Sequence, residues 1–526
     1  HAAGREVDLP YEIAQKWLDR SATRTLHSYR RTVLADAVIA ERFSGDPNML
    51  AAFKEIESAY AARLDGAKSE KESRRLTNQR DTDMAIVAGI RDRIRGTFGW
   101  DPDMKNLARI SQGALKINNI ISSHMMAVSS LPDFAGAIFR HGLQSAFGDG
   151  WSPFLAAMSD NVAWEAWKKA GNEWKAFGIG IETKTASRQH AIDDINDVYR
   201  PASRFERALS WASDKSFIVN LLSLETDLQK RIAANVASHN ILRATRALSE
   251  GKATKAQIAL LGESNITPAL AERIWKQFDN AGGADVQGVL LPNLAEWTDE
   301  SARLAFAGAV TRDVNIAVVT PGQEKPFWMS KQGWNVLGQY KSFVASATMR
   351  VLIANLQRAD AATMQGLVAS IGMGVLSYRI NTLVSGQPFS SDPSTVIKEG
   401  INRSGILGWI EEGNTFASKF TSGGIDIHRL YGANKPVSRF VNRNAAEMFL
   451  GPTYGKIQNL AKTAGASARA AGLAPTKPGE KPWTEADTHA MRMAVMGSNL
   501  PYLPRMFDQV ERGFNNAFGI DLKPRP

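Results

Sequence analysis

PASRFERALSWASDKSFIVNLLSLETDLQKRIAANVASHNILRATRAL, residues 201–248, is the stretch that best indicates the fold. Leu228, Ile232 and Val236 recur in it every four residues, whereas Arg231 points to another side. Apolar side chains repeated at this spacing lie on one face of a helix. We therefore predict one or two long helices over this stretch.

Helical spacing also dominates the rest of the chain, and the alternating pattern of a half-buried strand is scarce. Proline follows a capping residue at Asp46–Pro47 and at Thr267–Pro268, which is a typical start of a helix. The sequence thus predicts a mainly α fold, elongated or bundle-like, with irregular connecting loops and little or no β-sheet. Further helices are predicted at 11–40, 68–95, 299–319, 332–358 and 484–496, the last followed by a proline-bounded tail at 499–504.

The composition is that of a globular protein and excludes chemistry that depends on cysteine. Hydrophobic residues make up 44% of the 526 residues and charged residues 22%. These values allow a buried core and about two to four domains. The chain has no cysteine, which rules out disulfides, thiolate zinc sites and thiol nucleophiles. A net charge of +10 favours DNA, anionic lipid or acidic partners without identifying one of them.

Composition along the chain suggests four regions. The run 280–288, with two adjacent glycines, is the best boundary, and 464–482 has the Ala-, Gly-, Lys- and Pro-rich composition of an exposed linker. Trp164 and Trp167 share one helical face, where we expect them to anchor a core or an interface. The expected regions are a helical N-terminal region (1–145), a Trp-rich helical region (146–285), a helical domain with a Gly-rich apolar helix (286–463), and a linker with a C-terminal helix and tail (464–526).

Motifs of common enzyme classes are absent or incomplete. Gly451–Lys456 is one residue short of a phosphate-binding loop and lacks its hydroxyl, so we interpret it as a turn before a helix. No two of the eight histidines have the spacing of metal ligands on one helix face. Asp193, Asp194 and Asp197 lack the alternating ligands of a calcium loop and are interpreted as a solvated cluster. We predict no catalytic, cofactor-binding or metal-binding residue in this segment.

A lytic transglycosylase, which cleaves peptidoglycan, needs only one glutamate with a raised pKa, commonly followed by serine. Glu57–Ser58 and Glu263–Ser264 offer this dipeptide, but neither is followed by the rest of the family pattern. The chain begins at His1, without an initiator methionine or a signal peptide. We expect it to be part of a longer polypeptide, so a catalytic domain upstream stays an open alternative.

Met364–Tyr378 is the most hydrophobic helical stretch, and Arg379 is expected to end it. Its length falls short of the ~20 residues that span a bilayer, which favours a helix buried in a protein core. Gly366, Ser370 and Gly374 recur every four residues and would let a second helix approach closely. The alternative is a conditionally exposed segment that enters a host membrane after refolding.

An ordered series of short motifs near the C-terminus resembles a known family. The series contains QYKSF at 339–343, NRSGILGW at 402–409, SRF at 438–440, NAA at 444–446, GP at 451–452 and LPY at 500–502. Over residues 286–526 it resembles the C-terminal part of the large internal virion proteins of podoviruses, the T-odd coliphage class and its relatives. The similarity is weaker at LPD (131–133), FRHG (139–142) and SRFER (203–207). The candidate assembly residues within these motifs are Tyr340, Lys341, Phe343, Arg403, Ser404, Gly405, Arg439 and Pro452.

The resemblance implies a structural protein of the virion. Such a protein lies in a core stacked on the portal inside the capsid, leaves through the tail and helps to build a conduit across the host envelope for the genome. The implied partners are other ejection proteins, the portal, double-stranded DNA bound without sequence preference, and the host membrane and periplasm. A homo-oligomer is expected. A helical fold with local contacts suits unravelling and refolding during this passage.

Two other classes of protein stay open from the sequence. One is a virion-packaged enzyme, such as a murein hydrolase or a polymerase, whose catalytic part lies outside this segment or is weakly encoded in it. The other is a DNA-binding scaffold, for which the charge-dense run 68–95 would supply a basic stripe. The spaced opposite charges of that run are, however, typical of a solvated helix.

Overall fold

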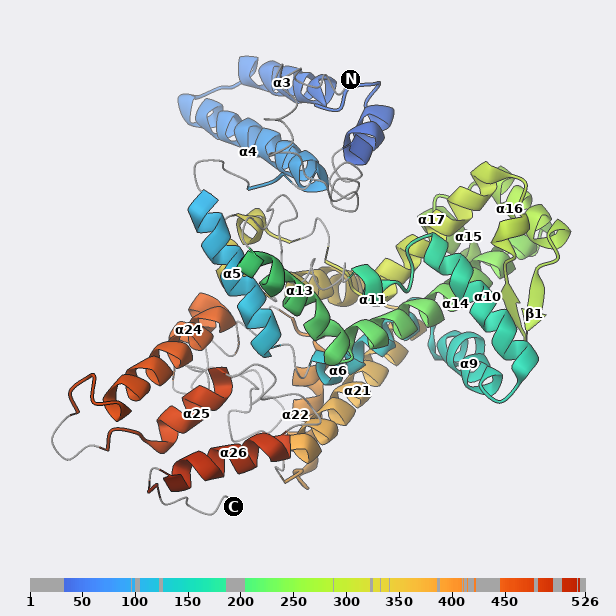
Figure 1. Ribbon diagram of the computed structural model, residues 1–526. Coiled ribbons are helices and arrows are strands. Elements are labelled where there is room, and N and C mark those ends of the chain that lie inside the picture. The colour runs from blue at the N-terminus through green and yellow to red at the C-terminus, as the bar shows by residue number, and fades with distance from the viewer. Residues whose placement is uncertain are drawn as a thin grey trace, which may run out of the picture. The chain divides into compact units, whose positions relative to one another are not determined.

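The computed structural model is mainly helical, which confirms the predicted fold class (Figure 1). It describes residues 33–95, 97–99, 105–122, 126–185, 204–286, 288–321, 325–331, 333–339, 341–385, 388–408, 410, 414, 421, 445–476, 481–494, 504–517 and 519–520. Within these residues, β-structure is limited to one two-stranded hairpin. Contacts divide the chain into two compact units, one formed by 1–112, 195–202 and 327–335 and the other by the rest. The four regions expected from composition stay a prediction.

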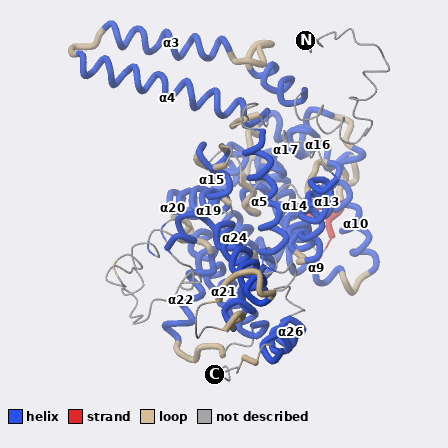
Figure 2. The backbone as a smooth tube through the Cα atoms, turned by 60° about the vertical axis from the view of Figure 1, so that its left-hand side comes forward, coloured by secondary structure: helices blue, strands red, loops and turns tan. Residues whose placement is uncertain are grey.

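The first unit is built on a helical hairpin, α3 (Leu50–Asp65) and α4 (Glu70–Arg95), whose two long helices run side by side (Figure 2). The hydroxyl of Tyr60 on α3 donates a 2.6 Å hydrogen bond to Asp83 on α4. On the exposed surface of α4, Arg74 pairs with Glu70 one turn away at 2.6 Å. The predicted helix over 68–95 is therefore confirmed, including its spaced opposite charges.

A distant segment completes this unit. The guanidinium of Arg93 on α4 lies 4.4 Å from the centre of the Phe327 ring, which begins the short helix η6 (Phe327–Ser330). Phe98 packs against the same ring with the centroids 5.2 Å apart. An arginine held over aromatic rings adds attraction to the burial of the rings themselves. This contact ties residues more than two hundred positions apart into one cluster.

The second unit is organised around α14 (Leu222–Ser249), which is buried along most of its length. Ile232 and Val236 are buried, while Arg243 is exposed. The preceding helix α13 (Arg204–Val219) ends just before Leu221, whose φ of 69° lies in the left-handed region that breaks a helix. The prediction of long helices in 201–248 is confirmed, with two of them.

Several helices surround α14 and form the main core with it. Trp174 on α10 and Phe306 on α17 are fully buried there, with their rings 6.4 Å apart. Thr267 caps α16 by accepting a hydrogen bond from the backbone of Leu270, which confirms the predicted start at Thr267–Pro268. The bounds are α10 (Asn161–Ala176), α15 (Lys255–Glu263), α16 (Pro268–Asn280) and α17 (Glu300–Ala317).

The run 280–288 forms part of an antiparallel hairpin inside the second unit. Its strands are β1 (Ala284–Val286) and β2 (Val289–Leu291), and Ala284 faces Leu291 in the register. Gly288 in the turn has φ +84°, a conformation that side chains rarely adopt. Val289 and Leu291 are buried with Ala170 of α10, so the hairpin covers that helix.

The predicted tryptophan anchors lie in a second core cluster. Trp167 is buried, and its ring lies 5.5 Å from that of Phe154 on α9 (Ser152–Ala157). Trp164 packs against the same cluster from the same face of α10. These side chains therefore contribute to the core, as their spacing predicted. Other helices between residues 105 and 296 are the long α5 (Lys105–Ser122) and the short α6 (Met126–Ser129), α8 (Leu143–Ser145), η4 (Ala146–Trp151), α11 (Glu182–Thr185) and η5 (Leu294–Glu296).

The apolar stretch forms α21 (Ala361–Ser385), which packs against α22 (Pro393–Ser404), η3 (Leu131–Ala135) and α7 (Gly136–His141). The expectation that Arg379 ends this helix is wrong, because α21 continues to Ser385. Arginine is a good helix former, so a charge can interrupt an apolar run without ending the helix. The guanidinium of Arg379 lies over the ring of Phe389 at 4.7 Å.

The predicted helix over 332–358 is interrupted. It consists of α18 (Trp334–Gly338), α19 (Lys341–Ala347), the π-helical turn η7 (Thr348–Ile353) and α20 (Ala354–Arg358). The predicted helix at 11–40 lies largely outside the described residues, as does the acidic cluster at 193–197.

Helices α24 (Ala445–Ala470) and α26 (Pro504–Ala517) correct three interpretations of the C-terminal part, whereas α25 (Glu485–Ala494) confirms the helix predicted over 484–496. Residues 451–456 lie within α24 and are not a turn before it. The expected linker at 464–482 begins inside the same helix, with Ala466 fully buried. Alanine is the best helix former, and low-complexity composition conceals that propensity. Beyond the expected tail, Pro504 begins a further helix, where its missing N–H costs nothing.

Candidate functional site

The fully buried positions and the exposed positions of helix α21 carry different side chains, and the partly buried Leu367 and Ile371 pack against the cluster around Phe139. Its buried face carries small or hydroxyl-bearing residues: Thr363, Gly366, Ser370, Gly374, Ser377 and Thr382. Its outward face carries large apolar ones, among them Met364, 62% exposed, Val368, 69% exposed, and Leu376, 44% exposed. A helix of a water-soluble protein normally turns its apolar stripe inward. The arrangement in α21 is the one found where the surroundings of a helix are apolar.

The same helix meets the length and composition of a membrane span. Over Ala361–Val384 its mean hydropathy is 1.4, and only 22% of its most apolar window is buried. A straight helix of this length measures ~36 Å, compared with a hydrocarbon core of about 30 Å. Within the described part of the chain, no second helix meets these criteria. A core helix can be as apolar as this one, but it would be mostly buried.

The inward face of α21 makes close helix contacts through the three small residues singled out from the sequence. A side chain at Gly366 would collide with Phe139 of α7, and one at Gly374 would collide with the carbonyl of Gly400 on α22. Between them, the hydroxyl of Ser370 donates a 3.4 Å hydrogen bond to the carbonyl of Ser404. These contacts let the backbones approach closely, as small residues do in packed helix pairs.

The NRSG motif at 402–405 ends the partner helix α22. Arg403 pairs with Glu399 at 3.0 Å, and its guanidinium lies 5.3 Å from the centre of the Tyr378 ring on α21. Gly405 has φ +70°, the left-handed conformation that ends many helices. The hydroxyl of Ser404 accepts a hydrogen bond from the backbone of Ile406 in that turn. The structure thus brings Arg403, Ser404 and Gly405 to the same helix pair as the small-residue stripe.

The other candidate assembly residues do not converge on this place. Lys341 and Phe343 lie half-buried on α19, and each takes part in further interactions. Pro452 lies within α24. Tyr340 and Arg439 lie outside the described residues.

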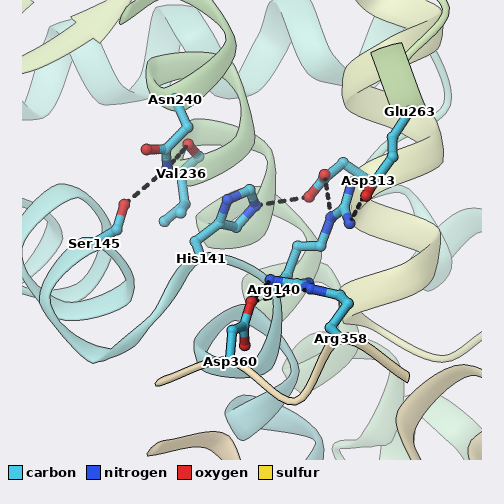
Figure 3. Close-up of polar contacts among 9 residues, drawn as sticks. All are labelled: Arg140, His141, Ser145, Val236, Asn240, Glu263, Asp313, Arg358 and Asp360. Atoms are coloured by element: carbon cyan, nitrogen blue, oxygen red, sulfur yellow. Dashed lines mark hydrogen bonds and ion pairs between the residues drawn. The ribbon is translucent and has the colours of Figure 1, made fainter. Parts of the chain in front are cut away.

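A polar cluster fastens α7, and with it α21, to the core around α14. On α7, Arg140 donates to the buried carboxylate of Asp313 on α17 at 2.8 Å and to Glu263 on α15 at 2.5 Å (Figure 3). The neighbouring His141 contacts the second oxygen of Asp313 through Nε2, also at 2.8 Å (Figure 3). Gly136 at the start of α7 leaves no room for a side chain beside the carbonyl of Ala317.

Asp313 is the electrostatic centre of this cluster. Burial raises the pKa of its carboxyl, but the attraction and hydrogen bonds of His141 and Arg140 outweigh burial and hold the pKa at about 2. The carboxylates in turn raise the pKa of Arg140, against the effect of its own burial. The Arg140–Asp313 ion pair therefore stays ionised near neutral pH. The sequence did not lead us to predict this contact of Arg140 and His141 with Asp313. The available signal was the run Phe139–His141, in which an aromatic residue precedes two basic ones.

The two Glu–Ser dipeptides do not come together in one site. Glu57 lies exposed on α3, and Glu263 is paired with Arg140. Among the described residues, no three His, Asp or Glu side chains are grouped as metal ligands would be.

Comparison with known proteins identifies no relative of this chain. No family model, no curated protein and no solved structure matches this chain. The resemblance to podoviral internal virion proteins therefore stays a prediction.

Proposed function

We propose that this chain is a structural internal virion protein that is ejected with the genome and lines part of a conduit across the host envelope. The observation that carries the proposal is the outward apolar face of α21, which has the length and exposure of a bilayer-facing helix. The motif series at 339–409 supports the family, and part of it lies on the helix pair that carries this face.

In the proposed function, the α21–α22 pair is the membrane-facing part. Glycine contacts hold the two helices together, so the polar inward face remains covered by protein while the apolar face meets acyl chains. The core around α14 stays outside the bilayer. Copies of the chain, the portal and other ejection proteins are its proposed protein partners, and DNA would be bound without sequence preference through Lys and Arg.

Vesicle flotation and dye leakage test this proposal. The double variant Val368→Ser/Leu376→Ser removes apolar surface from the outward face of α21. Two such side chains, partly exposed in the protein, contribute about 2 kcal/mol to transfer into lipid, so binding should weaken roughly thirtyfold. The matched control is Val162→Ser/Leu473→Ser, which changes the same residue types at positions 82% and 83% exposed.

The wild type and the control should float with vesicles and release dye equally, and the α21 variant should do so much less. Wild-type protein that neither floats nor causes leakage would exclude direct membrane contact. Equal loss in both double variants would show a general hydrophobic effect without a role for α21.

A further inference from the structure

The outward face of helix α13 combines cations with exposed aromatic rings. Trp211 is 65% exposed and Phe205 70% exposed, although large aromatic side chains are for the most part buried in folded proteins. Arg204 and Lys215 are exposed on the same helix. Arg204 and Phe205 come from the motif SRFER at 203–207, which has no part in the proposed membrane role of α21.

The opposite face of α13 already packs the helix against the core. Leu209, Ser213 and Phe217 recur there every four residues and are buried, and Phe217 packs with Leu222 of α14. Trp211 lies on the other side of the helix axis, since two residues correspond to about 200° of rotation. The exposed indole therefore adds little to the packing of α13.

Arg204, Trp211 and Lys215 form one line along the exposed face. Steps of seven and four residues are close to two turns and one turn of a helix, so the line covers about 16 Å. Within the described part of the chain, neither Arg204 nor Lys215 has a hydrogen-bond or ion-pair partner. Arg207 is also exposed but takes part in another interaction, so it is not counted as an available cation.

The acidic residues of α13 occupy other parts of the helix surface. Glu206 is half-buried and takes part in other interactions. Position 214, an aspartate, lies about 100° around the helix axis from Lys215. The line of Arg204, Trp211 and Lys215 therefore consists of two cations and one indole.

This mixture of side chains fits a single-stranded nucleic acid better than a lipid surface. A helix that lies on a membrane keeps its apolar face apart from its cationic face. In α13 the apolar face is buried, and cations and aromatic rings share the exposed one. A single strand offers phosphates to the cations and unpaired bases to the indole, which is how proteins bind such strands without sequence preference. The bases of a duplex are stacked inside it, where the ring of Trp211 could not reach them.

We propose that the exposed face of α13 binds a single strand of nucleic acid without sequence preference. The guanidinium of Arg204 and the ammonium of Lys215 contact phosphates, and Trp211 stacks on a base between them. Phe205 offers a second ring at the Arg204 end of the face. This site makes the DNA contact that the proposed function includes, and it is independent of the membrane role of α21.

Fluorescence anisotropy of a labelled thymidine oligonucleotide, titrated with the whole chain over a salt series, tests the site. Trp211→Leu should weaken binding about tenfold through the loss of stacking and leave the salt dependence unchanged. Lys215→Gln should instead reduce the slope of log affinity against log salt by about 0.7, since one phosphate contact is lost. The matched controls are Trp334→Leu on α18 and Lys255→Gln on α15, both at exposed positions, and they should change neither quantity.

Other ligands decide between the classes of partner. A duplex of the same length and polyglutamate of the same charge should each bind at least about tenfold more weakly than the single strand, and equal binding of either would overturn the proposal. Trp211→Leu should float with anionic vesicles as well as the wild type does. Impaired flotation of this variant would assign the face to lipid and would also overturn the proposal.

The two membrane and nucleic-acid proposals fail independently. A chain that does not bind the oligonucleotide refutes the α13 site and leaves the membrane role of α21 in place. A chain that binds the oligonucleotide but does not float with vesicles supports the α13 site and refutes the role of α21.

Discussion

Replacing Asp313 with asparagine removes the negative charge at the centre of the α7 anchor while it preserves the shape of the side chain. Asp313 is only 3% exposed and contacts both Arg140 and His141 at 2.8 Å. Among the described residues, Arg140, itself largely buried, would keep the half-exposed Glu263 as its carboxylate partner. Removing one partner of a buried ion pair typically costs about 3–5 kcal/mol, and the amide of asparagine retains some hydrogen bonding. We therefore expect a loss of about 3 kcal/mol near neutral pH.

The pH dependence of that loss follows from the pKa of Asp313. The pKa is about 2 in the folded protein, compared with a reference value of 3.8. A carboxyl whose pKa is lowered by folding contributes stability above its unfolded pKa and loses it as the pH falls through the folded value. The shift corresponds to about 2.5 kcal/mol. The difference between wild type and Asp313→Asn should thus shrink between pH 4 and pH 2.

Urea unfolding followed by tryptophan fluorescence measures both quantities, because Trp174 and Trp297 lie in the core that contains α17. Asp299→Asn is the matched control, since Asp299 also has a pKa of about 2 but is only partly buried at the start of α17, where it is bonded to Arg273. Asparagine caps helices well, so this variant should lose much less stability. A loss below about 1 kcal/mol in Asp313→Asn, or one that stays constant down to pH 2, would refute the electrostatic account of the anchor.

Two further predictions concern packing. Gly374→Leu should force α21 away from the carbonyl of Gly400 and lower the free energy of unfolding by about 2 kcal/mol or more. Gly372→Leu should be tolerated, because a side chain at Gly372 would meet nothing within 4 Å. Thermal unfolding compares the two variants. Trp174→Phe should lower the free energy of unfolding in urea by about 1–3 kcal/mol, since it removes the 2.9 Å hydrogen bond to the buried amide of Asn235. An unchanged unfolding midpoint would show that water replaces the indole as the partner of Asn235.

Local patterns were sufficient where apolar periodicity or a capping residue was clear. The four-residue repeat at Leu228, Ile232 and Val236 predicted α14, and Thr267–Pro268 predicted the start of α16, because periodicity and capping act over one or two turns. The same local reasoning failed at 451–456 and 464–482, where glycine, proline and low-complexity composition concealed α24. It also ended α21 too early at Arg379, because a charge was taken as the end of a helix.

The candidate site depended on contacts that no local pattern contains. The sequence by itself determined that α21 is apolar and carries a small-residue stripe at Gly366, Ser370 and Gly374. Only the tertiary structure decided that this stripe faces inward, since Phe139 and Gly400 approach it from segments far away in the chain. The same holds for Asp313, whose charge is held in the core by Arg140 and His141 from another helix. Periodicity identifies the faces of a helix, but which face is covered depends on what else the chain brings to it, and that is settled by long-range packing.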